Sequence, residues 1–275
     1  MKALRRTTLE VVAVLVAVVV FIVPFVFMFL TASKTADDAQ NLTFSWPKSW
    51  TIWQNLKDVF AYNNHELGTA FRNSMVLTVV SVTILVFLCS MVGFVVQRRP
   101  GKMSGAVNLL VLSGLIIPPA IVPTIWVMQH LHLFKSLPGL ILVEVAFGMP
   151  FCVLLFRAFV SAIPRELDEA AILDGCSGFS LYFRVIFPLL RPVTITVILV
   201  MSVTIWNDFV NPLYFLPGDQ NATVQLTLYN FISQFSTQYN LLFMNIVAIT
   251  VPPLILFIFF NRKIVSGMTA GAVKG

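Results

Sequence analysis

Residues 161–192 read SAIPRELDEAAILDGCSGFSLYFRVIFPLLRP. Pro164 suits the first turn of a helix, where a missing N–H costs nothing, and the acidic residues that follow it favour the positive end of the helix dipole. Gly175 can end this helix, and a second short helix can follow until Pro188 terminates it. The stretch therefore predicts two short helices at an angle, linked by residues 175–178.

Long apolar runs flank this stretch and belong to a set of six. Of the 275 residues, 58% are hydrophobic and 11% are charged, whereas a soluble domain carries about 25% charged residues. A helix of about 20 apolar residues crosses a bilayer. The predicted spans are residues 11–30, 75–96, 107–128, 140–160, 193–216 and 241–260. We therefore expect an all-α membrane protein with six transmembrane helices, forming a single domain over residues 1–275.

Two of these runs need comment. The first follows a basic start, as a secretory signal does, but it is longer than the usual 7–15-residue apolar core of a signal, so we interpret it as a retained span. The third contains Pro118, Pro119 and Pro123, which should kink or break its helix.

The distribution of Lys and Arg predicts the orientation of the spans. With the N-terminus inside, thirteen of the 18 Lys and Arg residues fall in inner segments and five in outer ones. Positive charge concentrates on the cytoplasmic side of membrane proteins. We expect both termini in the cytoplasm, and the stretch at 161–192 on the same side.

The outer segment 31–73 is long, semi-polar and rich in tryptophan. Trp46, Trp50 and Trp53 lie close together in it. Tryptophan suits a membrane interface, so an interfacial element is one interpretation, and contact with an outside partner is the other.

The stretch at 161–192 also resembles a known motif. The residues that carry the resemblance are Glu169-Ala170-Ala171, Asp174-Gly175 and Val185-Ile186-Phe187-Pro188. They are similar to the EAA loop of the permease subunits of binding-protein-dependent ABC importers, with Val and Phe at 185 and 187 where that family more often has Ile and Leu. The resemblance implies a coupling helix that docks into a cleft of an ATPase subunit, with contacts from Glu169, Ala170, Ala171, Asp174 and Gly175. The alternative is an amphipathic connector lying on the membrane.

Two other stretches resemble the carbohydrate-uptake subgroup of these permeases, the maltose-transporter type. One is Trp206-Asn207-Asp208-Phe209 with Pro212-Leu213, and the other is the tail, residues 261–275. The resemblance implies that the tail reaches the ATPase dimer. Its candidate contact residues are Arg262, Lys263, Gly271 and Lys274. A frayed polar end is the alternative.

Asp208 and Glu144 are the only acids well inside the predicted spans. An Asp at a helix centre costs roughly 2.5–3.5 kcal/mol to insert, so such groups usually face the bundle or a wet cavity. Trp206, Asn207, Asp208 and Asn211 could bind a hydroxyl-rich ligand and are candidate residues of a translocation pathway. An inter-helical hydrogen bond or a gate would also explain Asp208, and Glu144, near the outer start of its span, could be solvated.

Motifs of catalysis are missing from the sequence. The nearest stretch to a phosphate-binding loop, residues 101–104, lacks both the first glycine and the final hydroxyl of that motif. We expect a chain that is not an enzyme and binds no cofactor or metal, with ATP and Mg²⁺ on a partner subunit. A secondary transporter would explain the spans and Asp208, but not the pattern at 161–192.

The resemblance implies the partners of the chain. They are a second, similar permease, two ATPase subunits, an extracytoplasmic solute-binding protein and the lipid bilayer of a bacterial-type cell membrane; no nucleic acid is expected. By resemblance, the outer segment 217–239 contacts the binding protein. The sequence does not identify the sugar.

Overall fold

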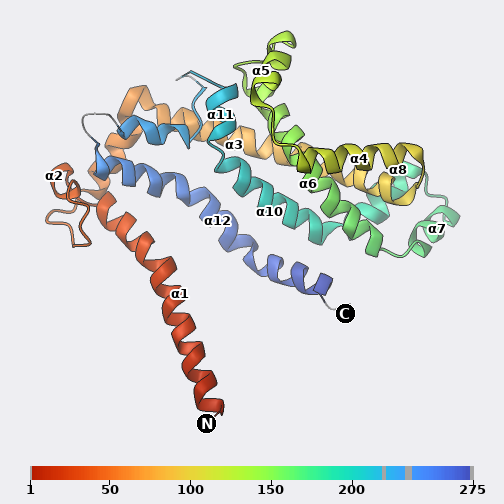
Figure 1. Cartoon of the computed structure of the whole chain (residues 1–275), viewed down its shortest axis with the longest axis horizontal. Coiled ribbons are helices and arrows are strands. Elements are labelled where there is room, and N and C mark those ends of the chain that lie inside the picture. Colours follow the sequence, from red (N-terminus) through yellow and green to blue (C-terminus); the bar gives the residue numbers. More distant parts are fainter. Residues whose placement is uncertain (1, 219–220, 233–236, 273–275) are drawn as a thin grey trace. The chain divides into compact units, whose positions relative to one another are not determined.

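The computed structural model describes the backbone of residues 2–218, 221–232 and 237–272, and the side chains within these ranges from residue 10 to residue 260. All regular elements in these ranges are helices (Figure 1), which confirms the predicted all-α class. The helices are α1 Lys2–Ala32, α2 Ala36–Ala39, α3 Ile52–Arg98, α4 Lys102–Ile116, α5 Ile121–His130, α6 Leu137–Ala162, α7 Glu166–Leu173, α8 Gly178–Leu181, the π-helix η1 Tyr182–Ile186, α9 Phe187–Leu189, α10 Arg191–Trp206, α11 Val210–Phe215, the 3₁₀-helix η3 Leu226–Phe231 and α12 Tyr239–Ala272.

The chain divides into two compact units. The first comprises Met1–Ala70 and Leu226–Val251, and the second comprises Phe71–Gln225 and Pro252–Gly275. The long helices α3 and α12 each contribute residues to both units. Each unit is described by itself below.

Four helices in the described part of the chain are long and apolar enough to cross a membrane. They are Glu10–Ala32, Ile52–Arg98, Leu137–Ala162 and Tyr239–Phe260, and they contain the predicted first, second, fourth and sixth spans. A fifth candidate combines Gly178–Leu189 with Arg191–Trp206, two segments that meet at a bend of 73°. The structure thus supports a multi-pass membrane protein with four or five such helices, rather than six continuous ones.

The predicted third and fifth spans are interrupted. In the third, α4 ends at Ile116 and α5 begins at Ile121, with Pro118 and Pro119 between them. Proline lacks the N–H that a continuing helix needs, so this break follows from the sequence. In the fifth, α10 ends at Trp206 and α11 begins only at Val210.

The predicted outer segment 31–73 is helical from Ile52 onward, so it is shorter as a loop than expected. The helix that follows, α3, contains an irregular turn at residues 62–65. Asn63, Asn64 and His65 have φ between 45° and 64°, a left-handed conformation that Asn tolerates better than most residues.

In the first unit, Lys34 ties this loop to the end of α1. Its side chain is fully buried, and its ammonium group donates to the carbonyl oxygen of Thr43 at 2.7 Å and to the hydroxyl of Ser45 at 3.1 Å. Asn55 of α3 donates to the carbonyl oxygens of Ala32 and Lys34, at 2.9 and 2.8 Å. These bonds fix the loop between α1 and α3 by its own polar groups.

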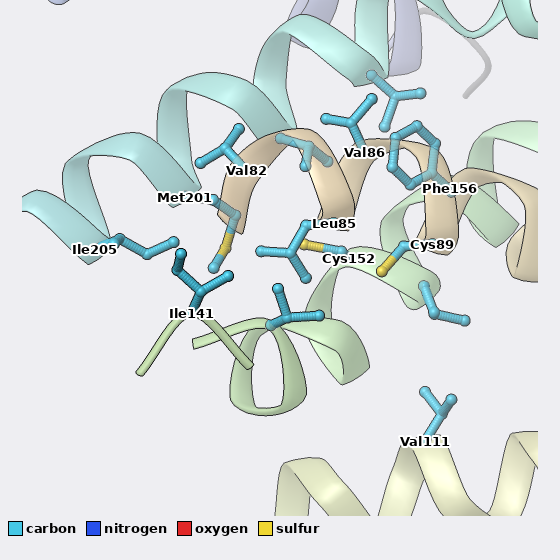
Figure 2. Packing of buried hydrophobic residues seen from close by; sticks show 14 of the residues in the cluster. Val82, Leu85, Val86, Cys89, Val111, Ile141, Cys152, Phe156, Met201 and Ile205 are labelled. Carbon is cyan, nitrogen blue, oxygen red and sulfur yellow. The ribbon is translucent and has the colours of Figure 1, made fainter. Parts of the chain in front are cut away.

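The core of the second unit lies between α3, α6 and α10 (Figure 2). Leu85 and Cys89 of α3, Cys152 of α6 and Met201 of α10 point toward one another there. α6 also packs against α4 and α11. A β-carbon at Gly148 of α6 would lie 2.6 Å from the Met201 side chain, so this glycine permits the close packing. Small residues serve this purpose between helices in membranes.

Candidate functional site

The connector between α6 and α10, residues 163–190, contains α7 and then a second helical stretch formed by α8, η1 and α9. The prediction that Pro188 ends this second helix is wrong, because Pro188 lies inside α9, in its first turn, where a missing N–H costs little. α7 begins at Glu166, with three acids in its first turn, and ends at Leu173. Gly175 has φ +84°, a conformation that costs glycine little. The amide of Gly175 donates to Ile172 O at 3.0 Å, and that of Cys176 to Ala171 O at 2.9 Å. This pair of bonds is the Schellman motif, which closes the helix end without outside help.

The predicted contact residues on α7 face different ways. Glu169, Ala170, Asp174 and Gly175 are exposed, whereas Ala171 is only 8% exposed and packs into the core of the unit. Ala171 therefore supports the helix from behind, and the surface that a partner could contact comes from its neighbours.

Three apolar side chains that the sequence reasoning did not single out extend this surface. Ile172, Leu173 and Phe179 are 57%, 88% and 73% exposed. Apolar side chains in a polar loop are the signal that could have identified them, since large apolar groups left in water often mark a binding site. Together with the exposed acids, they form a surface of mixed character, which we call the α7 face: Glu169, Ala170, Ile172, Leu173, Asp174, Gly175 and Phe179.

An ion pair holds the other side of α7 to the end of α3. Arg98 Nε lies 2.7 Å from Asp168 Oδ2, and Arg98 Nη2 donates to Ile163 O at 2.9 Å. The two charged side chains are 10% and 14% exposed. The guanidinium group thus binds both the first turn of α7 and Ile163, the residue that directly follows α6.

The second half of the connector is held to α3 by hydroxyl and aromatic contacts. The hydroxyl groups of Ser90 and Tyr182 lie 2.5 Å apart, and the rings of Phe87 and Phe187 stack at 5.5 Å. Tyr182 begins the π-helix η1, a widened turn that often occurs at functional positions. A cavity of about 390 Å³ is lined by Arg98 and Asp168 together with Phe94 and Tyr182.

The polar residues predicted in the fifth span organise its break. Asp208 Oδ1 accepts from the amides of Val210 at 2.8 Å and Asn211 at 3.2 Å, so the carboxylate caps the start of α11. The side chain of Asn207 donates to Val203 O at 2.9 Å, at the end of α10. Both groups serve the backbone at the interruption, which favours the packing interpretation of Asp208.

Asn211 connects this break to α6. Its side-chain amide donates to Glu144 Oε1 at 3.1 Å, and Glu144 is 5% exposed. The expectation that Glu144 could be solvated is therefore wrong. The α6–α11 contact buries it, and sequence spacing gave no sign of that contact.

Trp206 ends α10, directly before this break. It is 4% exposed, its ring lies 5.9 Å from that of Phe71, and it lines a groove of about 680 Å³ together with Thr78 and Ser202. The groove wall is otherwise largely apolar. Of the four predicted pathway residues, only Trp206 lines this groove.

Residues 222–225 follow α11. They are hydrogen-bonded to Asn73 and Ser74, at the start of the α3 segment that belongs to the second unit. Asn73 donates to Ala222 O at 3.1 Å, and the amide of Val224 donates to Ser74 Oγ at 3.0 Å. Gln225 donates to Asn207 Oδ1 at 3.1 Å. The sequence predicted Asn207 as a pathway residue. In the structure its side-chain oxygen accepts the hydrogen bond from Gln225.

The predicted tail contacts fall largely outside what the structure describes. Arg262, Lys263 and Gly271 belong to the backbone of α12, and their side chains lie outside the described ones. Lys274 lies outside the described residues altogether.

Comparison with known proteins gives a family match over most of the chain. Residues 74–270 match the family described as "Binding-protein-dependent transport system inner membrane component". The matched region includes the connector, the broken fifth span and α12.

Curated relatives cover most of the chain. It is 33% identical over 234 residues to the probable starch degradation products transport system permease protein AmyC of Thermoanaerobacterium thermosulfurigenes, which covers 84% of each chain. It is 31% identical over 218 residues to the melibiose/raffinose/stachyose import permease protein MelC of Bacillus subtilis, covering 78% of this chain and 79% of that one.

Solved structures share the fold. A chain of a bacterial ABC transporter involved in the import of the acidic polysaccharide alginate matches with a TM-score of 0.80 at 17% identity, covering 94% of this chain and 96% of that one. A chain of the bacterial alginate transporter in complex with its alginate pentasaccharide-bound periplasmic protein matches with a TM-score of 0.69 at 15% identity, covering 95% of each.

Proposed function

Because this chain belongs to the family of inner-membrane components of binding-protein-dependent transport systems, we propose that it forms half of the passage of an ATP-driven importer for sugars. Such components are not enzymes, and ATP is hydrolysed on a partner subunit. The family assignment disfavours a secondary transporter, which would need no such partner.

The relatives support a sugar as the substrate. AmyC, MelC and the arabinooligosaccharide permease AraQ of Bacillus subtilis are all named for carbohydrate transport. Oligosaccharides are therefore the substrate class that we propose first. The solute-binding protein would make most of the selection.

The single observation that carries the coupling role is the α7 face. Leu173 and Phe179 are left exposed on a connector whose backbone is otherwise tightly held. Burying such side chains against a partner contributes about 25 cal/mol per Å² of apolar surface, so an ATPase subunit with an apolar cleft would bind here.

The remaining parts of the assembly follow from this placement. The connector and both termini would lie in the cytoplasm, as the charge distribution predicts. A second permease would complete the passage, and a solute-binding protein would dock outside. The tail, with Arg262, Lys263, Gly271 and Lys274, would make a second ATPase contact. ATP binding would pull on α7 and open the passage outward, and hydrolysis would reset it.

The pathway role is proposed for Trp206 alone among the four predicted residues, since it lines the groove. Asn207, Asp208 and Asn211 would shape the wall by fixing the break between α10 and α11. A sugar would stack on an aromatic side chain and bond to neighbouring hydroxyl groups, and Ser202 is the nearest candidate of that kind on α10.

The test is purification of the complex through a tag on this chain. Leu173→Asp should remove the ATPase subunit from the purified complex and abolish uptake, because it places a charge in the proposed apolar contact. Met103→Asp is the matched control, since Met103 is 82% exposed near the start of α4; this variant should retain both. A Leu173→Asp chain that still copurifies with the ATPase would contradict the α7 face as its docking site.

A further inference from the structure

Within the second unit, residues 71–98 of α3 make polar contacts at both of their ends. We infer that this segment transmits the movement of α7 to residues 222–225, with Arg98 and Asn73 as the positioning residues at its two ends. The inference rests on the proposed function of the α7 face and assigns the route by which that face acts on the outer side of the chain.

The inner end is attached to the connector by a chemically strong contact. Arg98 Nε lies 2.7 Å from Asp168 Oδ2 as an ion pair, and Nη2 donates to Asp168 Oδ1 at 3.3 Å and to the carbonyl oxygen of Ile163 at 2.9 Å. The charge attraction and the two hydrogen bonds from one nitrogen together hold the guanidinium group against the connector. Any displacement of α7 would therefore displace the end of α3.

A second inner attachment lies two turns further along α3. The Ser90 and Tyr182 hydroxyl groups are 2.5 Å apart, and both side chains are buried. The ring of Tyr182 also lies 5.7 Å from that of Phe94. Because the two attachments lie at different positions along α3, the helix cannot pivot about either one alone.

The outer end is attached to residues 222–225 by a pair of hydrogen bonds. Asn73 donates to Ala222 O at 3.1 Å, and Ser74 Oγ accepts from the Val224 amide at 3.0 Å. Ser74 is 3% exposed and Val224 is fully buried. Breaking a buried bond of this kind costs free energy, so this short segment would follow the outer end of α3.

Residues 71–98 are stiff enough for this role. They are helical throughout and contain no proline, since the irregular turn of α3 lies earlier, at Tyr62–His65. At 1.5 Å per residue they extend roughly 40 Å, the thickness of a bilayer with its headgroups. The other three membrane-length helices in the described part of the chain each contain internal proline: Pro24 in α1, Pro150 in α6, and Pro252 and Pro253 in α12. Proline removes a backbone bond and weakens a helix as a rigid element.

Close contact along its length holds the segment in place. Leu77, Leu85 and Cys89 are buried to 1% exposure or less. A β-carbon at Gly93 would lie 3.0 Å from the backbone nitrogen of Arg157 in α6. Tightly packed interiors of this kind transmit displacements instead of absorbing them.

The inner attachment, residues 71–98 of α3 and the outer attachment act in series, and variants at the two ends can test this. If α3 transmits movement, breaking either end interrupts the same route, so breaking both ends adds nothing. If the two ends have separate local roles, their effects on the rate multiply, as expected of distant and independent sites.

The experiment is a double-mutant cycle in the reconstituted complex. Arg98→Ala and Asn73→Ala are compared singly and together, in uptake assays over a range of concentrations of sugar-loaded binding protein. Each single variant should lower the maximal uptake rate about 5- to 20-fold, a typical size for coupling between sites. The half-saturating concentration of binding protein should stay unchanged, and the double variant should match the slower single one.

Two further variants complete the test. Leu88→Ala is the matched control on α3, because Leu88 is 40% exposed and lies outside the groove that contains Trp206; it should transport normally. Ser90→Ala replaces Arg98→Ala in a second cycle, because it leaves no charge behind and avoids a variant that fails to assemble. Rates that multiply in both cycles, or a Leu88→Ala loss equal to that of Asn73→Ala, would overturn the inference. Failure of the Leu173→Asp prediction would instead overturn the proposed function, so the two results are distinguishable.

Discussion

Arg98 in the second unit and Lys34 in the first are both cations that fasten a loop to the end of a helix; the side chain of Arg98 is 10% exposed and Lys34 is fully buried. Arg98 binds a carboxylate, that of Asp168, at 2.7 Å. Lys34 binds neutral oxygens, the Thr43 carbonyl at 2.7 Å and the Ser45 hydroxyl at 3.1 Å. The two attachments have similar lengths, and they differ in the charge of the partner.

That difference predicts how each attachment fails. Removing one member of a buried ion pair leaves the other charge unpaired in a poorly solvated place, which costs far more than the lost bond. Removing a cation from neutral oxygens leaves groups that water can satisfy, because Thr43 and Ser45 are exposed. The connector should thus depend on its cation more strongly than the α1–α3 loop depends on Lys34.

The largest expected effect is that of Arg98→Ala. It should destabilise the connector by about 3 kcal/mol, because the Asp168 carboxylate would be left buried without its counter-charge. Limited proteolysis of the purified chain in detergent measures this as faster cleavage between α7 and α8. Exchanging the two residues, Arg98→Asp with Asp168→Arg, should restore much of the protection. Cleavage as slow as in the unaltered chain would contradict the role of the ion pair.

Glu144→Ala should have an intermediate effect and isolates the contribution of the acceptor. One partner, the amide of Asn211, is neutral, and the side chain of Asp208 lies within hydrogen-bonding reach as well; the loss of the buried acceptor should cost about 2 kcal/mol. Glu144→Gln keeps an oxygen in the same place and should be close to neutral. Thermal unfolding in detergent measures both variants. A large loss of stability in Glu144→Gln would show that the charge of residue 144 matters, and would contradict its role as a simple acceptor.

Lys34→Met should have the smallest effect of the three, about 1 kcal/mol, because only neutral hydrogen bonds are lost and the apolar stem is replaced. Trp46 and Trp50 lie in the same loop with rings 6.2 Å apart, so the tryptophan emission spectrum should shift as the loop loosens. Thr43→Val removes only the Thr43 hydroxyl, 3.5 Å from the ammonium group, keeps the carbonyl acceptor and serves as the control. If Lys34→Met destabilised the protein as much as Arg98→Ala, the charge of the partner would not explain how strongly each attachment contributes.

Local features of the fold were predictable from the sequence. Gly175 forecast the end of α7, because a Schellman closure depends only on neighbouring residues and a glycine in the left-handed conformation. Pro118 and Pro119 forecast the break in the third span, since their rings exclude a continuous helix. The helix at α7 begins at Glu166, two residues after the proline that predicted its start.

Features that depend on distant residues were not predictable. Pro212 favours a helix interruption at residues 208–211, because a helix continuing from α10 would lack its N–H; what the sequence does not show is that Asn211 reaches Glu144 of another helix. The sequence placed Lys34 among the five cations of the outer segments. Only the folded loop shows that its side chain is buried. The burial of Ala171 is of the same kind, because α7 alone does not determine which of its faces meets the core.

The Schellman closure of α7 has a consequence for recognition. The amides of Gly175 and Cys176 are already bonded to Ile172 and Ala171 in the uncomplexed chain. A receptor that grips this bend would therefore find it preorganised and would lose little conformational entropy on ordering it. The free energy of contact with these residues would then be available for affinity, because little of it is spent on ordering the bend.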